Sequence, residues 1–545
     1  METVAVVSAD LPLLPSGRAP TERNRAFRAF ARSNRVPLIA TVPTLPLYAV
    51  WVAFLATGGG DLAAQEAWAR FVSEHGTSAY GLFWYGGMHT ANYSLISPYL
   101  MAAVGVKTVT VASGVAGAWL VAALIARTGV RHPLWPAVLA SLAVWCNVAS
   151  GRTTFALGLA FGLAACLVLV GERRVWAAVA FGALATMSSP VAGLFLLVVG
   201  AGFLLVRDRK RAAALLVPPV MVVGVTTVLF PFTGEQLMPF DRVFPPVVFS
   251  LAVVVAAPRR WRVLRWGAAV YATGTVLTYL VPSPIGTNVE RLAELLAPAV
   301  LLAALLAPAL DRVRRTVLAI ALVLSTAWVA QKTADDLTVS TAVPEWAVDT
   351  HGVVRELERL GADRGRVEVV PARNHREATA LAPHVNMARG WNRQLDVERG
   401  RLFYDGSFSA ATYRAWLDKW AVGYVVLPSG KPDGFAEDEA ALVASGPDWL
   451  KPEWKDTHWQ IFRVEDPVPM VSAPAIVVRS TGSDMVVRVP TREPVTLRLV
   501  YSPWLRAEGA CLKRHGEFTR LTVSTPGTYR ISSGYGPSPS PSSCR

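Results

Sequence analysis

The sequence predicts a polytopic α-helical membrane protein with a C-terminal region outside the membrane. Hydrophobic residues make up 52% of the 545 residues, and charged residues only 17%. The long apolar runs all end near residue 331. Because a hydrocarbon core of roughly 30 Å needs about 20 apolar residues per helix, this part has room for about eleven spans. Loops rich in basic residues also alternate with loops that hold few of them, which indicates how the chain is oriented in the membrane.

The apolar runs give the predicted spans in order. They lie at 36–57, 94–126, 133–150, 153–170, 175–187, 190–206, 212–230, 243–257, 265–281, 293–309 and 316–331. The first run has no small-residue cleavage site after it, so we interpret it as a span and not a signal peptide. The short fifth and sixth runs meet at Pro190 and predict a hairpin or a re-entrant pair.

The loop charges predict that the N-terminus is inside. The tail 1–35 is rich in arginine, and so are the loops around Arg127, Arg173, Arg209, Arg260 and Arg314. The opposite loops hold few basic residues. By the positive-inside rule, the C-terminal region then lies outside the cytoplasmic (inner) membrane. The same distribution explains the net charge of +14 without nucleic acid as a partner.

The chain changes character after residue 331, where charged residues, turn formers and tryptophans replace the alanine and valine runs. Helical and strand patterns alternate over 332–467 and predict an extracytoplasmic α/β domain. Alternating and β-branched runs over 468–536 predict a β-rich, sandwich-like domain. The last residues, 537–545, read as a flexible tail.

The four cysteines divide into two pairs. Cys146 and Cys166 fall in apolar spans and are expected to be small core residues. Cys511 and Cys544 fall in the region predicted to be outside, where a disulfide between them can form.

The first outer loop, 58–93, is the longest and opens with GGGDLAAQEAW. Asp61 follows three glycines and precedes a run of helix formers. One interpretation makes it the N-cap of that helix; the other makes it a reactive carboxylate at the membrane surface. Trp68, Phe71 and Val72 recur at helical spacing and predict an amphipathic helix lying on the membrane.

This arrangement resembles the GT-C superfamily of integral membrane glycosyltransferases. The shared features are a first span, an acidic residue that opens a juxtamembrane helix in the first outer loop, many further spans and an outer C-terminal domain. The resemblance implies that Asp61 is the catalytic base and that the donor sugar is carried on a polyprenyl phosphate. It leaves open a divalent metal ion, Mg²⁺ or Mn²⁺, for which the sequence offers no ligand spacing. The stretches VTLRLVYSPWLRAEGACL and WAVGYVVLP are also similar to C-terminal modules of some bacterial members.

The rest of the outer loop supplies candidate acceptor or sugar-binding residues. These are Glu66, Trp84, Tyr85, His89, Asn92 and Tyr93. Aromatic rings stack on sugar faces, but aromatic residues are also enriched at any membrane interface, and both interpretations stay open.

Three basic residues beside spans are candidates for the donor phosphate. Arg291 stands near a predicted helix start, where backbone N–H groups and a guanidinium both favour phosphate. The alternative is a capping box of Thr287 and Glu290 beside a snorkelling arginine. Arg152 opens another outer helix, and Lys107 lies in an otherwise apolar span.

The sequence therefore predicts an inverting membrane glycosyltransferase. It would transfer sugar from a polyprenyl-phosphate donor to a cell-envelope glycan or lipid acceptor. The alternatives are a transporter or flippase of a lipid-linked precursor, and a non-catalytic envelope scaffold. Richness in alanine, arginine and valine is typical of a high-GC bacterium and indicates an actinobacterium.

Overall fold

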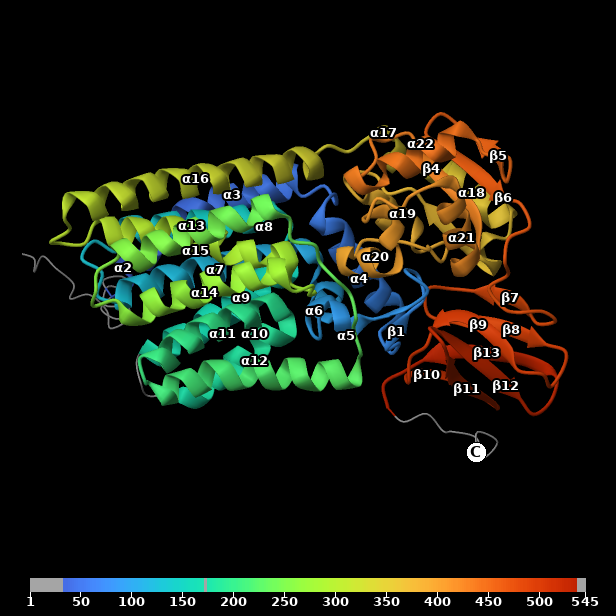
Figure 1. Cartoon of the computed structure of the whole chain (residues 1–545), viewed down its shortest axis with the longest axis horizontal. Coiled ribbons are helices and arrows are strands. Elements are labelled where there is room, and N and C mark those ends of the chain that lie inside the picture. Colours follow the sequence, from blue (N-terminus) through green and yellow to red (C-terminus); the bar gives the residue numbers. More distant parts are fainter. Residues whose placement is uncertain (1–32, 171–173, 537–545) are drawn as a thin grey trace, which may run out of the picture.

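A computed structural model describes residues 33–170 and 174–536. The arginine-rich tail up to residue 32, Arg173, Cys544 and the predicted flexible tail lie outside these ranges. The chain forms a long helical bundle with two smaller C-terminal regions at one end (Figure 1). The first of these is a mixed α/β region, and the second is a pair of β-sheets.

The bundle begins with one helix made of four consecutive short segments. These are α2 (Arg35–Thr41), η1 (Val42–Thr44), α3 (Leu45–Val50) and η2 (Trp51–Leu55). The other bundle helices follow as α6 (Ser97–Val104), α7 (Val106–Arg127), α8 (Leu134–Ala149), α9 (Thr153–Val170), α10 (Val175–Ser188), α11 (Pro190–Leu205), α12 (Arg209–Leu229), α13 (Phe240–Ala256), α14 (Arg262–Leu280), α15 (Glu290–Leu305) and α16 (Arg312–Thr341). A short helix, η3 (Gly286–Val289), precedes α15.

Five helices of the described chain are long and apolar enough to cross a membrane. They are Arg35–Leu55, Val106–Arg127, Thr153–Val170, Arg209–Leu229 and Arg312–Thr341. Large apolar side chains such as Phe54, Trp176 and Val228 point outward without a protein partner covering them. Apolar surface of this extent is stable against lipid and not against water. The chain is a membrane protein.

Two predicted spans differ from the observed helices. The run 94–126 is broken at Gly105, whose φ of 89° ends α6 and begins α7. The last helix, α16, extends to Thr341 instead of stopping at residue 331. It therefore carries Lys332 and Asp336 on a continuous helix that reaches the C-terminal region (Figure 1).

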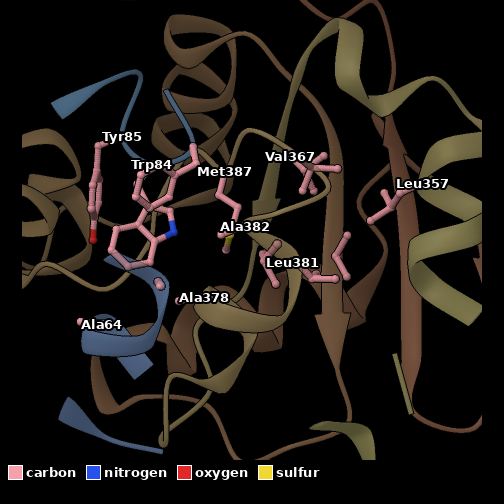
Figure 2. Packing of buried hydrophobic residues seen from close by; sticks show 14 of the residues in the cluster. Ala64, Trp84, Tyr85, Leu357, Val367, Ala378, Leu381, Ala382 and Met387 are labelled. Atoms are coloured by element: carbon pink, nitrogen blue, oxygen red, sulfur yellow. The ribbon is translucent and has the colours of Figure 1, made fainter. Parts of the chain in front are cut away.

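The loop 58–93, predicted to be the first outer loop, forms α4 (Asp61–His75), a two-stranded sheet of β1 (Tyr80–Gly81) and β2 (Met88–His89), and α5 (Thr90–Tyr93). The prediction that α4 lies on the membrane surface is wrong. Its apolar residues, including Trp68 and Phe71, are buried in one core with residues of the α/β region. Figure 2 shows Ala64 of α4 in this core, together with Ala378 and Ala382. Amphipathic spacing does not distinguish a lipid-facing helix from one covered by another domain.

The α/β region contains a four-stranded sheet in the order β3-β4-β6-β5. Its strands are β3 (Arg366–Val369), β4 (Val422–Pro428), β5 (Leu450–Lys455) and β6 (Trp459–Val464). Strands β3 and β4 are parallel, and the other pairs are antiparallel. The helices are α17 (Glu345–Val348), α18 (His351–Arg359), α19 (Arg376–Leu381), α20 (Arg393–Arg399), α21 (Ala410–Trp420) and α22 (Glu437–Ser445), with short turns η4 (Ala362–Arg364), η5 (Arg401–Phe403) and η6 (Gly434–Ala436).

The last region packs two antiparallel sheets around one core. One sheet has the order β10-β13-β8-β7 and the other β11-β12-β9. The strands are β7 (Ile476–Ser480), β8 (Met485–Val489), β9 (Val495–Val500), β10 (Leu505–Ala507), β11 (Ala510–His515), β12 (Phe518–Val523) and β13 (Gly527–Ser533). Cys511 is disulfide-bonded; its predicted partner Cys544 is outside the described ranges. Tyr80 and Leu82 of the first outer loop join this core and tie the loop to it.

Candidate active site

Asp61 is the first residue of α4, and its carboxylate does not cap that helix. Gly60 occupies the N-cap position, and no side-chain capping bond is present there. The N-cap interpretation of Asp61 is therefore wrong. The side chain is 35% exposed. An acidic group in the first turn is favoured by the helix dipole while its oxygens stay available to other partners.

Two arginines from distant parts of the chain face this carboxylate. Arg152 Nε lies 3.7 Å from Asp61 Oδ2, and Arg291 Nη2 lies 3.8 Å from the same oxygen. Arg152 directly precedes α9, and Arg291 is in the first turn of α15. Three of the residues singled out in the sequence therefore meet at one point.

The Arg152 guanidinium bonds mainly to two other carboxylates. Its Nη1 donates to Glu294 Oε2 at 2.6 Å, and its Nη2 donates to Asp336 Oδ2 at 3.1 Å. Both distances are shorter than the one to Asp61. Charge-assisted bonds of this length are the strong ones, so Arg152 is a fixed hub between α4, α15 and α16.

The ion pairs continue from Arg152 along α15 and α16. Lys332 Nζ lies 2.6 Å from both Glu290 Oε2 and Glu294 Oε1, and Arg242 Nη1 lies 3.9 Å from Glu290 Oε2. We call the whole set the Asp61 cluster: Asp61, Arg152, Arg242, Glu290, Arg291, Glu294, Lys332 and Asp336. Opposite charges alternate along it, which offsets much of the cost of placing ions beside a membrane.

The capping-box interpretation of Thr287 and Glu290 is wrong. Val289 is the N-cap of α15 and makes no side-chain capping bond. Glu290 instead accepts from Lys332, and Thr287 Oγ1 accepts from Gln236 Nε2 at 3.1 Å.

Arg291 has a sparser environment than Arg152. Its contacts in the described part of the chain are the Asp61 ion pair and the ring of Phe155, whose centroid lies 5.3 Å from the guanidinium carbon. Its side chain is 20% exposed. A guanidinium has five N–H donors, so Arg291 retains capacity to bind a further anion.

Tyr93 borders the Asp61 cluster. Its ring stacks on Trp68 at 5.7 Å between centroids and is half-buried. Burial raises the pKa of Tyr93, and the nearby Asp61 carboxylate raises it further. The phenol therefore stays protonated at neutral pH and can act as a neutral hydrogen-bond donor or acceptor.

Trp84, Tyr85 and His89 do not present a face to a sugar. All three are buried, with Trp84 and Tyr85 in the core shared with the α/β region. The Tyr85 hydroxyl donates to the Gly390 carbonyl oxygen at 2.8 Å. Burial lowers the pKa of His89 to about 4. Asn92 donates to the Pro231 carbonyl oxygen at 3.4 Å. The predicted aromatic surface is an interior because the C-terminal regions cover it.

Glu66 and Lys107 lie outside the Asp61 cluster. Burial raises the pKa of Glu66, although Lys107 and Arg376 act in the opposite direction. Lys107 is exposed at the start of α7. Neither residue shares an ion pair with Asp61 in the described chain.

The glycine segment before Asp61 is held by the α/β region. The Gly60 N–H donates to the Asn374 carbonyl oxygen at 2.8 Å, and the Gly60 carbonyl oxygen accepts from Trp391 Nε1 at 3.0 Å. Arg376 donates to the Thr57 carbonyl oxygen and, at 2.8 Å, to that of Ser340.

Close approach explains the glycines of this segment. Gly58 and Gly60 have φ values of 88° and 62°, which disfavour any side chain. A Cβ at Gly59 would lie 2.6 Å from the Ser340 carbonyl oxygen. The segment is therefore a fixed support for Asp61.

The described residues contain no ready-made metal cluster of histidine, cysteine or carboxylate side chains. No group of three histidine, cysteine, aspartate or glutamate side chains within 33–170 and 174–536 is close enough to hold a metal ion. The carboxylates of the Asp61 cluster are instead paired with arginine and lysine.

Sequence reasoning missed Glu294, Lys332, Asp336 and Arg376. Glu290 and Glu294 stand four residues apart, as do Lys332 and Asp336, so each pair shares one face of its helix. That spacing was a usable signal. The predicted last span ends at residue 331, so Lys332 and Asp336 fall just beyond it. Arg376 had no signal in the sequence.

Comparisons with known proteins complete the description of the site. No protein-family model and no curated protein matches the chain. One similar solved structure is the cryo-EM structure of arabinofuranosyltransferase AftD from Mycobacteria, at a TM-score of 0.42 and 13% identity. The match covers 82% of this chain and 42% of that chain, so this chain spans less than half the length of that protein.

Proposed function

We propose that this protein is an inverting glycosyltransferase of the GT-C type. It transfers a sugar from a polyprenyl-phosphate donor to a cell-envelope glycan or lipid acceptor, on the extracytoplasmic face of the cytoplasmic membrane. The observation that carries the proposal is the meeting of a part-exposed carboxylate, Asp61, with an under-occupied guanidinium, Arg291, at 3.8 Å.

An inverting transfer needs a base on one face of the transferred sugar and an anion-stabilising group on the other. The sugar therefore has to part the Asp61–Arg291 pair, which lies at 3.8 Å before the donor binds. Asp61 accepts the proton of the acceptor hydroxyl as its oxygen bonds to the anomeric carbon. The bond from that carbon to the phosphate oxygen breaks, and its electron pair leaves with the polyprenyl phosphate. Attack from the face opposite the leaving group inverts the anomeric centre.

Arg291 is the group assigned to the leaving phosphate. Its spare donors favour an oxygen-rich anion, and positive charge beside the developing phosphate lowers the barrier. Phosphate bound there would compete with Asp61 for Arg291 and free the carboxylate to act as base.

Arg152 takes a different role from the one expected of it. Three carboxylates already surround its guanidinium. We assign Arg152 to positioning Asp61 relative to α15 and α16, not to binding the donor. Lys107 is left out of the phosphate site because it is exposed and outside the Asp61 cluster.

The acceptor side is assigned to Tyr93, which borders Asp61 and has its hydroxyl protonated. The residues Trp84, Tyr85 and His89 are buried, so we assign them to packing of the loop that carries Asp61 and not to contact with sugar. The sugar itself is left to a donor screen, with arabinose and mannose as the first candidates.

Replacement of Asp61 by Asn tests the proposal. We expect transfer by the protein in nanodiscs, supplied with polyprenyl-phosphoryl sugars, to fall about 10²–10⁴-fold because the general base is removed. The melting temperature should change little. The matched control is Asp335→Asn, since Asp335 is an exposed carboxylate beside the cluster on α16. Equal activity of the Asp61 variant and wild type would end the assignment.

A donor screen that yields no transfer would count against the enzyme as a whole. Movement of the intact lipid-linked sugar across the bilayer, without transfer, would support the flippase alternative.

A further inference from the structure

A second feature of the bundle lies away from the Asp61 cluster. A cavity of about 580 Å³ is lined mainly by α7, α9, α11, α13, α14 and α15. Its walls are apolar and include Leu124, Leu163, Phe195, Val253 and Leu296. This volume falls in the range typical of ligand sites, and walls of this kind offer water no hydrogen-bond partners.

The cavity is not fully closed, and α14 forms part of its wall. Val263, Leu264 and Ala268 line it and are only half-buried. Helix α14 packs along α11 and α13, whereas α7, which forms another wall, packs along α8 and α9. In a bilayer, an opening between these helices faces hydrocarbon chains.

One end of the cavity is basic. Arg260, Trp261 and Arg262 line it in the turn between α13 and α14. Arg260 and Arg262 are exposed, and neither has a carboxylate partner among residues 33–170 and 174–536. A tryptophan and unpaired arginines beside an apolar chamber are the features that hold an anionic lipid headgroup.

The other end of the cavity stops short of Arg291. Tyr271 closes it, with its hydroxyl donating to the Val289 carbonyl oxygen at 2.6 Å. Phe195 lines the cavity and packs at 5.7 Å against Phe155, which in turn lies under Arg291. Two aromatic rings therefore separate the cavity from the Asp61 cluster.

The basic end lies at the opposite end of α14 from the Asp61 cluster, and we assign it to the opposite leaflet. Arg262 begins α14 and Arg291 follows the end of that helix. A helix of 19 residues is about 28 Å long, close to the thickness of the hydrocarbon core. A lipid whose phosphate lies at Arg260 and Arg262 is therefore not a donor whose phosphate lies at Arg291.

We propose that the cavity binds one acyl chain of an anionic phospholipid from that opposite leaflet, with the lipid phosphate held by Arg260 and Arg262. The chain would fill the space between α7 and α14 and support the wall on which Tyr271 and α15 rest. This site is independent of the proposed transferase activity.

Native mass spectrometry of the delipidated full-length protein tests the site. The probes are phosphatidylglycerol and phosphatidylcholine with identical acyl chains. We expect one phosphatidylglycerol to bind more tightly than phosphatidylcholine. Replacing both Arg260 and Arg262 by Gln should weaken phosphatidylglycerol about fivefold per arginine and leave phosphatidylcholine unchanged.

A glycine on α14 allows the cavity to be filled. A Cβ at Gly267 would meet nothing closer than the Val198 carbonyl oxygen at 3.9 Å, so Gly267→Leu places its side chain in the free space. We expect binding to fall more than about tenfold. Gly274→Leu is the matched control, because Gly274 is on the same helix, has nothing within 4 Å of an added Cβ and does not line the cavity.

Three results would overturn the proposal: wild-type binding by Gly267→Leu, equal binding of the two phospholipids, or displacement of phosphatidylglycerol by polyprenyl phosphate. The last result would assign the cavity to the donor chain. If Gly267→Leu does not fold, the exposed arginine pair carries the test. Since no turnover is measured, failure here leaves the transferase proposal untouched.

Discussion

Two groups of ion pairs in this molecule use the same chemistry in different surroundings. The Asp61 cluster lies at the end of the bundle, and the Arg389 cluster lies inside the α/β region. In the Arg389 cluster, Arg389 binds Glu368 at 2.7 Å and also Glu439, and the Tyr413 hydroxyl donates to Glu439 at 2.8 Å. All four side chains are buried.

The two clusters differ in how far their side chains are exposed to solvent. Burial raises the pKa of Glu368 well above its usual range, although Arg389 acts in the opposite direction. In the Asp61 cluster, Asp61 and Asp336 have side chains 35% and 37% exposed, and the Asp61 contacts are longer than hydrogen bonds. An enclosed cluster serves folding, whereas an open one can exchange a protein partner for a substrate.

The largest expected effect compares one arginine from each cluster. Arg389→Gln should lower the free energy of unfolding by about 3–5 kcal/mol, because it leaves Glu368 and Glu439 buried without a cation. Arg291→Gln should cost less than about 1 kcal/mol, because it removes one loose, part-exposed pair. Melting temperatures of the two variants in the same detergent check this. Equal losses would remove the distinction between the clusters.

The second largest expected effect concerns His375. This residue lies against Trp391, which bonds to Gly60 next to Asp61. Its ring stacks on Trp391 with centroids 3.5 Å apart and faces Asp433 at 3.2 Å and Glu377 at 3.6 Å. Burial lowers the pKa of His375, but these two carboxylates outweigh burial and raise it overall. Asp433, also paired with Arg393, has its pKa held far below the usual range and stays ionised at neutral pH.

A raised pKa in the folded state means that protonated His375 stabilises the fold. This contribution is complete below the unfolded pKa of about 6.5 and is lost as pH rises through the higher folded pKa. We expect the melting temperature to fall as pH rises above about 6.5 and through the higher folded pKa, and this fall to be reduced in His375→Gln. An unchanged pH profile in the variant would contradict the assignment.

The smallest effect concerns the bond from Trp391 to Gly60. Trp391→Phe keeps a ring against His375 but removes the Nε1 donor to the Gly60 carbonyl oxygen. The expected loss of stability is about 0.5–1.5 kcal/mol. If the α/β region positions Asp61, kcat should fall severalfold while the donor KM stays the same. Trp449→Phe, a substitution of the same kind away from the loop, is the control. A change in KM alone would instead place Trp391 at the substrate.

Several elements could be predicted because local pattern determines them. Helix α9 at Thr153–Val170 coincides with the predicted span 153–170. The alternation of helical and strand patterns over 332–467 also corresponds to the observed α/β region, with helix α21 at Ala410–Trp420 and strand β6 at Trp459–Val464. The break at Gly105 could not be predicted, because a glycine inside a continuous apolar run leaves the hydropathy unchanged. The fate of Trp84 could not be predicted either, since a membrane interface and an interdomain core are both rich in aromatic residues.

The sequence by itself determined which residues are apolar enough for a membrane and which charged residues stand beside the spans. Asp61, Arg152 and Arg291 could be named on that basis, because a charge next to an apolar run is costly and needs a reason. The tertiary structure alone decided how these charges pair. It made Arg152 a saturated hub by bringing Glu294 and Asp336 to it, and left Arg291 with donors to spare. Pairing of charges depends on distances between helices far apart in the chain, and no local pattern contains those distances.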